Sequence, residues 1–375
     1  PLLYFSLFHL PVDGGIMITG SHNPPEYNGF KVTRGQETLT GEDLQEIQRL
    51  IEQGAFVHGE GELSQADVIT PYLRLVQEKI HLGRRLHVVI DCGNGTAGVL
   101  APTLIRELGC QVTELYCEPD GHFPHHHPDP TVPENLRDLI QTVREQEADV
   151  GLAYDGDADR LGAVDDRGNI VWGDQLMVLF ARDILSRHPG ASIIFDVKCS
   201  QNLVQEIVAR GGKPIMWKTG HSLIKKKLRE TQAALAGEMS GHLFFADDYF
   251  GYDDAIYASC RLLQFLSHTD QPLSALLESL PRTYSTPEIR ADCPEEQKFE
   301  VVKALQEYFS SRYEVIDIDG VRINFGYGWG LIRASNTQPV IVLRFEADTP
   351  EHLREIRQRI ENKLREFPAV RLPSD

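Results

Sequence analysis

Short apolar runs alternate with amphipathic helical patterns through the middle of this chain. Residues 87–154 predict three strands separated by two helices, and the same alternation resumes over residues 174–245. Strands that alternate with helices favour a parallel sheet whose connecting helices cover its faces. The sequence therefore predicts two α/β units in series. The predicted helices are residues 101–108, 134–145, 174–186, 202–210 and 221–230.

The two ends of the chain have different patterns. Residues 1–65 hold an apolar opening stretch and an amphipathic helix around Leu44, which is too little for a complete α/β layer. Residues 282–296 are rich in proline and charge, so they predict a linker. Beyond it, a helix, two strands and a closing helix with Thr349 as its cap and Pro350 in its first turn predict a small α+β domain. The predicted domains are residues 1–65, 66–168, 169–283 and 284–375.

The composition of the chain limits the kinds of molecule that it can be expected to bind. The chain has 375 residues and a net charge of -18, which argues against nucleic acid or an anionic membrane surface as a partner. No apolar run reaches the roughly 18 residues that a membrane span needs. The six cysteines include no C-x-x-C pair, so they are expected to be free thiols in a cytoplasmic protein. An anionic ligand would need positive side chains concentrated at its site.

Three carboxylates directly follow an apolar, strand-like run. Asp155, Asp157 and Asp159 occupy alternate positions of the motif DGDADR, and Arg160 ends it. Such carboxylates repel one another unless a cation lies between them, and oxygen ligands favour Mg²⁺ or Ca²⁺. An EF-hand loop does not fit, because positions 6 and 12 counted from Asp155 are Arg160 and Asp166 instead of Gly and Glu. The motif predicts a divalent metal site, and Arg160 favours a phosphate beside it.

Two other motifs admit a structural and a functional interpretation. Gly93, Gly95 and Gly98 have the G-x-G-x-x-G spacing of a dinucleotide site, which would suit a nicotinamide-dependent oxidoreductase. Tight packing between a strand and a helix explains the same glycines, and we prefer it. The histidine-rich stretch GHFPHHHPDP at residues 121–130 resembles a metal cluster, but consecutive histidines cannot all turn inward from one backbone. Its flanking prolines indicate a rigid loop.

Three further loops carry polar groups. The stretch GIMITGSHNPPEYNGFK brings an apolar strand into a glycine-flanked turn that holds Ser21, and Lys31 follows ten residues later. In GEMSGH, Glu238 and Ser240 offer the acceptor and donor that neighbouring sugar hydroxyls need. The loop RASNTQP has the composition of a site for a terminal phosphate, with a hairpin loop as the plain alternative. Its phosphate-binding candidates are Arg333, Ser335, Asn336 and Thr337.

Together these motifs resemble the α-D-phosphohexomutase superfamily. Ser21 within TGSHNP, then DGDADR, GEMSGH and RASNT, occur in this order over essentially the whole chain, and GEMSGH is most similar to the bacterial phosphomannomutase/phosphoglucomutase branch. The resemblance implies three α/β domains with mixed sheets and a C-terminal α+β domain around a central cleft. It also implies a reversible interconversion of hexose 1-phosphate and hexose 6-phosphate through a phosphoserine enzyme and a 1,6-bisphosphate intermediate.

The resemblance further implies a role for each site residue. Ser21 would carry the phosphoryl group and hold one Mg²⁺ with Asp155, Asp157 and Asp159. Lys31, Arg160 and His242 would complete the catalytic set, with either Lys31 or His242 as the general base. Glucose and mannose phosphates are the expected substrates, because a grip on ring hydroxyls 3 and 4 leaves position 2 unread. The expected assembly is a monomer or weak dimer. The implied substrate-binding residues are Lys198, His221, Glu238, Ser240, His242, Arg333, Ser335, Asn336 and Thr337.

The chain departs from the family pattern at its beginning. Family members carry most of a domain before the serine loop, whereas 20 residues precede Ser21 here. This predicts a truncated, impaired enzyme whose first sheet exposes apolar edges. Two alternatives to a phosphomannomutase/phosphoglucomutase stay open. Phosphoglucosamine mutase is only weakly disfavoured by Met239, and a non-catalytic sugar-phosphate-binding fragment is disfavoured by the intact Ser21 and aspartate motif.

Overall fold

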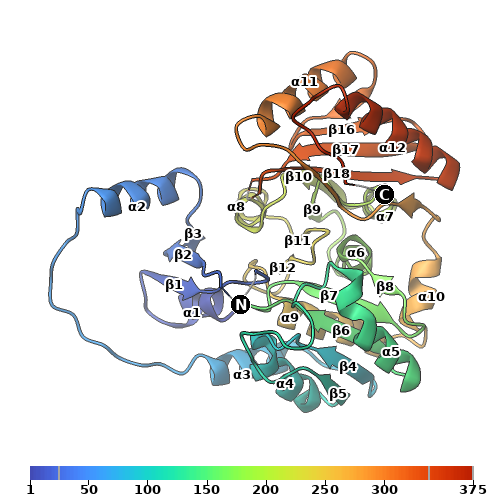
Figure 1. The fold of residues 1–375 in the computed structure, drawn as a ribbon. Coiled ribbons are helices and arrows are strands. Elements are labelled where there is room, and N and C mark those ends of the chain that lie inside the picture. The colour runs from blue at the N-terminus through green and yellow to red at the C-terminus, as the bar shows by residue number, and fades with distance from the viewer. Residues whose placement is uncertain (24–25, 337, 374–375) are drawn as a thin grey trace. The chain divides into compact units, whose positions relative to one another are not determined.

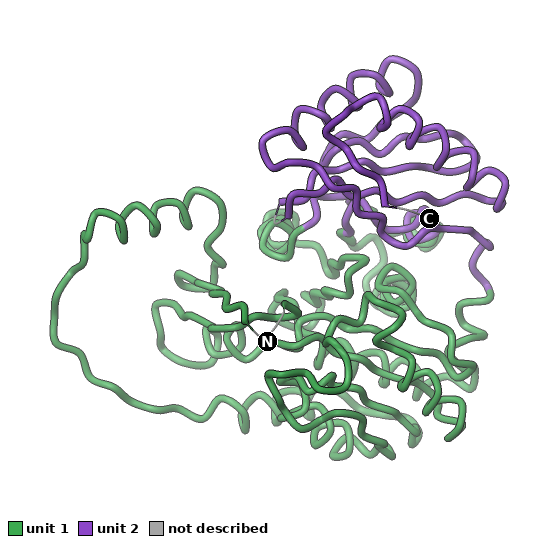
Figure 2. The backbone as a smooth tube through the Cα atoms, in the orientation of Figure 1, with its two compact units in different colours: residues 1–194, 205–214, 220–278 green, residues 195–204, 215–219, 279–375 purple. Residues whose placement is uncertain are grey.

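The computed structural model describes residues 1–23, 26–336 and 338–373. The chain divides into two compact units, drawn in different colours in Figure 2. Among the described residues, no helix combines the length and the apolar character that crossing a membrane requires. Unit 1 comprises residues 1–194, 205–214 and 220–278, and unit 2 comprises residues 195–204, 215–219 and 279–375.

A small antiparallel sheet positions the serine loop of unit 1. β1 (Gly14–Ile18) pairs with β2 (Phe30–Arg34), which pairs in turn with β3 (Glu37–Thr38). In this register Met17 lies opposite Lys31, so the turn that follows β1 leaves the sheet beside Lys31. The strand predicted before Ser21 is confirmed.

The elements around this small sheet differ in burial. α1 (Leu2–His9) buries four apolar side chains, whereas α2 (Glu42–Glu52) buries none, although it forms where the amphipathic pattern predicts it. Ile18 and Phe30 of the sheet are each 65% exposed, so an apolar face of this sheet meets solvent. Residues 53–67 form neither helix nor strand and are exposed throughout, and Figure 1 shows them as a long arc after α2.

The second sheet carries the aspartate motif. Its strand order is β5-β4-β6-β7-β8. β4 pairs in parallel with β5 and β6, as predicted, but β6, β7 and β8 form an antiparallel meander that the sequence analysis missed. The motif DGDADR is therefore the tight connection between β6 and β7. The strands are β4 (His87–Asp91), β5 (Gln111–Leu115), β6 (Val150–Tyr154), β7 (Leu161–Asp165) and β8 (Ile170–Val171).

Helices cover this second sheet. Leu139 and Val143 of α5 pack on Val89 of β4 in a fully buried cluster, which fixes the helix on the strand pair that leads to the aspartates. The predicted helix 134–145 begins with a 3₁₀ turn before α5. The helices here are α3 (Ile69–Lys79), α4 (Ala101–Glu107) and α5 (Arg137–Glu145), with 3₁₀ turns at Thr96–Val99 and Pro133–Leu136.

The third sheet has the order β10-β9-β11-β12, and its β11–β12 hairpin presents the GEMSGH loop. The strands are β9 (Ser192–Asp196), β10 (Lys213–Trp217), β11 (Leu235–Gly237) and β12 (Leu243–Phe245). The helices are α6 (Gly173–Arg187), α7 (Gln201–Ala209), α8 (His221–Thr231), α9 (Ala255–Ser267) and α10 (Leu273–Glu278). We did not predict α9, in which 11 of the 13 residues are buried and which therefore lacks the broad polar face of a surface helix. Its one local signal is Asp254, whose side chain caps the helix by accepting the Tyr257 N–H at 2.9 Å.

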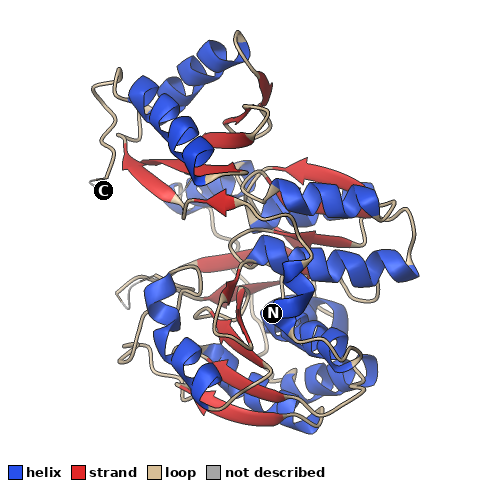
Figure 3. Ribbon diagram, turned by 90° about the vertical axis from the view of Figure 1, so that its right-hand side faces the viewer, coloured by secondary structure: helices blue, strands red, loops and turns tan. Residues whose placement is uncertain are grey.

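A six-stranded sheet forms the core of unit 2. Its order is β13-β18-β17-β16-β15, and β14 also pairs with β18. α11 and α12 pack on one face of it, as Figures 1 and 3 show, and the closing helix is capped by Thr349 as predicted. The predicted linker at residues 282–296 is wrong in part, because β13 and β14 lie within it. The elements are β13 (Tyr284–Ser285), β14 (Ile289–Asp292), α11 (Lys298–Ser310), β15 (Glu314–Ile316), β16 (Val321–Asn324), β17 (Gly328–Ala334), β18 (Val340–Ala347) and α12 (Pro350–Leu364).

Candidate active site

The serine loop holds Ser21 in a strained conformation beside the aspartate motif. Ser21 has a φ of 50°, a left-handed value that is uncommon for a residue with a side chain. The turn is fixed where it leaves β1, because the Thr19 hydroxyl accepts the Ser21 N–H at 2.8 Å. Ser21 Oγ then lies 3.0 Å from Asp155 Oδ2 and 2.9 Å from Asp157 Oδ1. A local turn thus delivers this hydroxyl to carboxylates more than 130 positions away.

Backbone contact between the two loops requires a glycine in the aspartate motif. A Cβ added to Gly156 would lie 2.0 Å from the carbonyl oxygen of Ser21. Asp155 also shapes its own loop, because its Oδ1 accepts the backbone N–H groups of Asp159 and Arg160 at 3.0 and 3.1 Å. The second residue of DGDADR therefore sets the close approach, while its first carboxylate orders the turn.

The carboxylates of the motif crowd together in a buried place. One ligand atom from each of Asp155, Asp157 and Asp159 can be chosen so that all lie within 4.8 Å of one another. Burial and the charges of Asp159 and Asp157 raise the pKa of Asp155 well above its ordinary value. Lys31 Nζ lies 2.8 Å from Asp157 Oδ2 and also contacts Asp159. These oxygen atoms could hold a cation, and they fit the divalent metal site that the sequence predicts.

The GEMSGH hairpin docks on the aspartate loop. Arg160 and His242 form an isolated antiparallel bridge, and the Leu161 N–H donates to the Gly241 carbonyl at 3.0 Å. Arg160 Nε donates to His242 Nε2 at 3.0 Å, so both predicted catalytic side chains lie at this junction. His22 lies beside Arg160, with its Nε2 3.4 Å from Arg160 Nη1, and its Nδ1 is 3.1 Å from Ser21 Oγ. Burial and the Arg160 charge lower the pKa of His22 to about 4.

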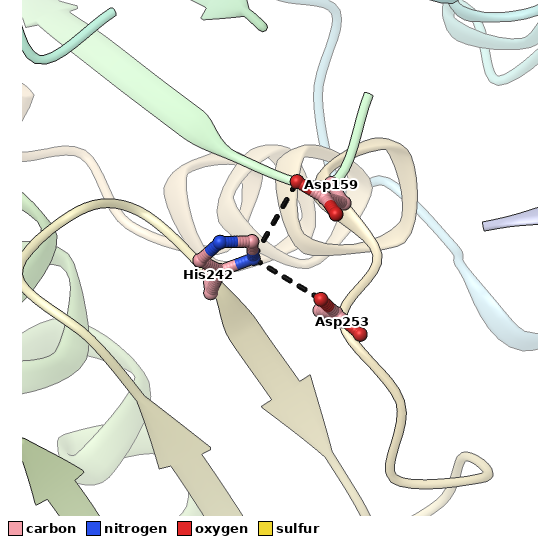
Figure 4. Close-up of side chains that lie close together, drawn as sticks. All are labelled: Asp159, His242 and Asp253. Atoms are coloured by element: carbon pink, nitrogen blue, oxygen red, sulfur yellow. Dashed lines mark ion pairs between the residues drawn. The ribbon is translucent and has the colours of Figure 1, made fainter. Parts of the chain in front are cut away.

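Asp253 joins this junction, and the sequence analysis missed it. Figure 4 shows Asp159, His242 and Asp253 converging, with His242 Nδ1 3.1 Å from Asp253 Oδ2 and 3.5 Å from Asp159 Oδ1. By distance alone these groups can hold a metal. However, Arg160 donates to Nε2, so in a neutral ring Nδ1 carries the proton and has no lone pair for a metal. In the sequence Asp253 is one of two adjacent acidic residues in the loop before α9, and no local pattern distinguishes it from a solvated carboxylate.

Glu238 and Ser240, the predicted sugar contacts, lie together in the hairpin loop. Ser240 Oγ donates to Glu238 Oε2 at 2.9 Å, and Glu238 Oε1 accepts the Gly220 N–H at 2.7 Å. His221, the first residue of α8, follows directly after that glycine. Burial and the charge of Lys225 lower the pKa of His221 to about 3. Three predicted substrate-binding residues therefore border one another in unit 1.

The remaining predicted residues belong to unit 2. Lys198 Nζ lies 3.2 Å from Glu288 Oε2, and Arg333 Nε donates to Asp319 Oδ2 at 2.9 Å. Lys198 and Arg333 are both nearly buried, at 7% and 6% exposure. A buried guanidinium held by one carboxylate keeps a fixed direction, which suits recognition of a second anion. Ser335 and Asn336 follow β17, and Thr337 lies outside the described residues.

The competing glycine and histidine motifs have structural roles here. A Cβ on Gly98 would lie 1.8 Å from the Cys117 carbonyl oxygen, and one on Gly95 would lie 2.9 Å from the backbone of Gly156. These glycines accommodate protein backbone, as the preferred interpretation held. Within the histidine-rich stretch, His126 Nε2 lies 3.0 Å from Asp91 Oδ2. This ion pair fixes the loop on the end of β4.

Comparison with known proteins agrees with this geometry. The phosphomannomutase/phosphoglucomutase of Pseudomonas aeruginosa is 50% identical over 366 residues, which cover 97% of this chain and 79% of that protein. The phosphoglucomutase of Neisseria gonorrhoeae is 47% identical over 379 residues, covering all of this chain and 82% of that protein. The crystal structure of a phosphoglucomutase/phosphomannomutase family protein from Burkholderia thailandensis matches with a TM-score of 0.90 and 46% identity, over 97% of this chain and 78% of that one.

The matches to family models extend along nearly the whole chain. They are the models of the phosphoglucomutase/phosphomannomutase alpha/beta/alpha domains I, II and III, at residues 1–58, 70–168 and 172–284, and of the C-terminal domain at residues 288–363. The chain belongs to the phosphoglucomutase/phosphomannomutase family, within the α-D-phosphohexomutase superfamily. The predicted family, fold class and enzyme class, a phosphohexomutase, are confirmed. The predicted domain boundaries and residue roles stay predictions.

Proposed function

We propose that this chain is a phosphomannomutase/phosphoglucomutase that interconverts hexose 1-phosphates and 6-phosphates through phosphorylated Ser21 and a hexose 1,6-bisphosphate. The observation that carries this proposal is the position of Ser21 Oγ, 3.0 and 2.9 Å from carboxylates of Asp155 and Asp157. Lys31 contacts the same aspartate motif. A hydroxyl, oxygen ligands for a divalent cation and an ammonium at one point are the parts that phosphoryl transfer needs.

The carboxylate oxygens of the aspartate loop fit Mg²⁺, and we propose that this loop binds that ion. Asp155, Asp157 and Asp159 would hold it together with a phosphate carried by Ser21. When bound, Mg²⁺ neutralises charge on the transferring phosphoryl group. Asp155 is held within its loop, because its Oδ1 accepts the backbone N–H groups of Asp159 and Arg160.

The transfer assigns complementary tasks to His242 and Lys31. The bond between phosphorus and Ser21 Oγ breaks, a bond to the free sugar hydroxyl forms, and the hydroxyl proton moves to His242 Nε2. His242 suits the base role because Nε2 is unprotonated: it accepts the Arg160 N–H in this structure, and it can take the substrate proton once that N–H moves away. Lys31 is engaged as a donor to two carboxylates and can stabilise the departing serine oxygen. The bisphosphate then turns over and returns its other phosphoryl group to Ser21.

The remaining predicted residues would bind the sugar ring and the phosphate that does not react. Glu238 and Ser240 would bind ring hydroxyls 3 and 4, and this grip would allow both glucose and mannose phosphates. His221 borders the same loop. The unit 2 residues Lys198, Arg333, Ser335 and Asn336, with Thr337, would bind the phosphate that does not react.

The wider setting follows from the same proposal. The six cysteines are free in the structure, which fits the reducing cytoplasm. We further propose a monomer or weak dimer and four domains, at residues 1–65, 66–168, 169–283 and 284–375. Its proposed partners are small-molecule substrates, the phosphates of glucose and mannose.

The phosphoserine is tested by intact-mass measurement of the chain and its Ser21→Ala variant after incubation with glucose 1,6-bisphosphate and Mg²⁺. The unaltered chain should gain a removable adduct of about 80 Da, and Ser21→Ala should gain none. Ser310→Ala is the matched control, because Ser310 lies on the exposed end of α11 and its hydroxyl donates to the Gln306 carbonyl. An adduct on Ser21→Ala, or no adduct on the unaltered chain, contradicts the proposal.

Substrate choice needs a separate measurement. Turnover of mannose 1-phosphate and glucose 1-phosphate should exceed turnover of glucosamine 6-phosphate by at least about tenfold, which corresponds to about 1.4 kcal/mol. The opposite preference would support phosphoglucosamine mutase. Turnover of none of these substrates by a chain that still binds them would support the non-catalytic binding fragment.

A further inference from the structure

Asp253 is a fully buried carboxylate to which the proposed mechanism gives no task. It lies in the loop between β12 and α9 and is 0% exposed. Its backbone is fixed opposite β12, because Asp253 and Phe244 form an antiparallel bridge. His242 directly precedes this same strand. The fold therefore holds the Asp253 carboxylate at a constant place relative to His242.

Charged groups surround this carboxylate in an ordered way. Lys225 Nζ donates to Asp253 Oδ1 at 2.9 Å, and the Lys225 ammonium itself lies 3.7 Å from the centre of the Tyr4 ring. Asp253 Oδ2, the other oxygen, faces His242 Nδ1 at 3.1 Å and His221 Nδ1 at 3.5 Å. One oxygen is thus anchored by a lysine while the other faces the imidazole of the proposed base (Figure 4).

The contact on the opposite side of the His242 ring decides which nitrogen carries the proton. Arg160 Nε donates to His242 Nε2 at 3.0 Å, and an arginine N–H cannot accept. Nε2 must therefore present its lone pair, so the proton of the neutral ring lies on Nδ1. That proton faces Asp253 and, at 3.5 Å, Asp159. Nδ1 is close to Asp253 without being aligned as a hydrogen bond, an arrangement common in sites without substrate.

Asp253 is better suited than Asp159 to hold this proton. Asp159 is one of the predicted metal ligands and its Oδ2 is already bound by Lys31. Asp253 lies closer to Nδ1. Among the described residues, the metal group that could include Asp253 is the cluster of Asp159, His242 and Asp253, and a proton on Nδ1 excludes a metal there.

We propose that Asp253, held by Lys225, is a positioning residue for His242. It keeps the imidazole proton on Nδ1, so that Nε2 stays unprotonated and can exchange the Arg160 N–H for the substrate proton. Its negative charge also stabilises the imidazolium that forms when Nε2 has taken that proton. The inference rests on the proposed function, because it gives Asp253 a task in the same phosphoryl transfer. The position of the proton is a property of the resting chain and can be measured without turnover.

Kinetics of Asp253→Asn test the positioning role. Asn has the same shape but no charge, so kcat should fall by about 10- to 100-fold with KM changed less than about threefold. The matched control is Asp254→Asn, the neighbouring buried carboxylate, which caps α9 instead of facing His242. Asp254→Asn should keep kcat within about twofold. Equal kcat losses in the two variants, or an unchanged kcat in Asp253→Asn, overturn the inference.

A double-variant cycle separates positioning from general damage to the fold. On a His242→Ala background, Asp253→Asn should lower kcat by less than about twofold, because its partner has already gone. A second loss as large as the first would show that Asp253 acts independently of His242 and would overturn the inference.

The tautomer is measured by nitrogen NMR of histidine-labelled chain, with the His242 signals assigned by their loss in His242→Ala. The unaltered chain should show a protonated Nδ1 and an unprotonated Nε2 in the His242 ring. A proton on Nε2 overturns the inference even if Asp253→Asn does not fold. Failure of the proposed function is distinguishable, since it would appear as absent mutase turnover in the unaltered chain whatever the tautomer.

Discussion

Two ionic clusters in unit 1 both combine aspartates with basic side chains, but they differ in their balance of charge. The arginine cluster, defined here as Asp183, Asp247, Arg187 and Arg261, pairs two anions with two cations. Arg261 binds Asp247 through two parallel contacts of 3.0 and 3.1 Å. In the metal-site cluster, defined as Asp155, Asp157, Asp159 and Lys31, three carboxylates face one ammonium. The first cluster is neutral, and the second carries excess negative charge.

The protonation behaviour of the two clusters follows from this difference. Burial opposes ionisation of Asp247, yet Arg261 and Arg187 hold its pKa below the ordinary value. Burial raises the pKa of Asp155 well above the ordinary value of an aspartate, and the charges of the neighbouring aspartates raise this pKa further. Among the described residues, buried Asp159 Oδ1 has no hydrogen-bond partner, whereas no buried atom of the arginine cluster lacks one. The arginine cluster pairs each carboxylate with a cation, whereas the metal-site cluster keeps an excess of carboxylates whose repulsion the proposed metal ion would relieve.

The largest expected effect comes from removing one charge of the metal-site cluster. Asp155→Asn should lower mutase kcat by about 10³-fold or more, roughly 4 kcal/mol in transition-state stabilisation, because an oxygen ligand of the cation loses its charge. In the presence of a chelator, the free energy of unfolding of the same variant should be up to about 1 kcal/mol higher than that of the unaltered chain. The reason is that the repulsion between the carboxylates is reduced. Steady-state kinetics and urea unfolding measure the two effects. A large loss of stability in chelator would show that this cluster is structural after all.

The arginine cluster should respond in the reverse way. Asp247→Asn removes the charge behind the two parallel contacts of buried Arg261 and leaves it Asp183 as its carboxylate partner in the cluster, so the free energy of unfolding should fall by about 3 kcal/mol. Mutase kcat should remain within about twofold at temperatures well below the melting transition. Denaturant unfolding with parallel kinetics measures both quantities. A kcat loss comparable with that of Asp155→Asn would break the distinction between the clusters.

An intermediate case lies in unit 2, where Glu288 pairs with Lys198 and Arg290 at 3.2 and 3.1 Å. Burial opposes ionisation, but these cations lower the pKa of Glu288 from 4.5 to about 2. Because the folded pKa is the lower one, the contribution to stability is complete above about pH 4.5. It is lost as pH falls from 4.5 toward 2. Stability of the unaltered chain should therefore drop across this interval by about 1 to 3 kcal/mol more than that of Glu288→Gln.

The Glu288 measurement uses chemical unfolding at pH 6, 4 and 3. The difference in stability between the unaltered chain and Glu288→Gln should shrink as pH falls. A difference that stays constant across these values would show that the pair does not favour ionisation in the folded state.

Much of the fold was predictable from the sequence because its elements are short and regularly patterned. β4, β6 and β9 are apolar runs, and helices such as α5 have one apolar face. The failures occur where a local rule is overridden by tertiary pairing. β14 lies in a stretch rich in proline and charge, yet Ile289 and Ala291 pair with β18 and enter the core. α9 lacks the broad polar face of a surface helix, because 11 of its 13 residues are buried.

The candidate site was predictable to a similar extent. Ser21 and the aspartate motif are recognisable because three alternate carboxylates after a strand have few structural explanations. Asp253 was not recognisable, since a carboxylate in a polar loop is usually solvated. Its importance depends on two facts absent from local sequence: the bridge that sets it opposite Phe244, and the lysine of α8 that anchors it.

The sequence by itself determined which chemistry this protein can carry, because the side-chain types and the loops that hold them are local properties. It determined the order of the four motifs and the strands that lead into three of them. Only the tertiary structure decided which charges meet. The pairing of Met17 with Lys31, the bridge of Arg160 with His242 and the position of Asp253 arise from strand register. Register depends on contacts between distant segments, so no local pattern encodes it.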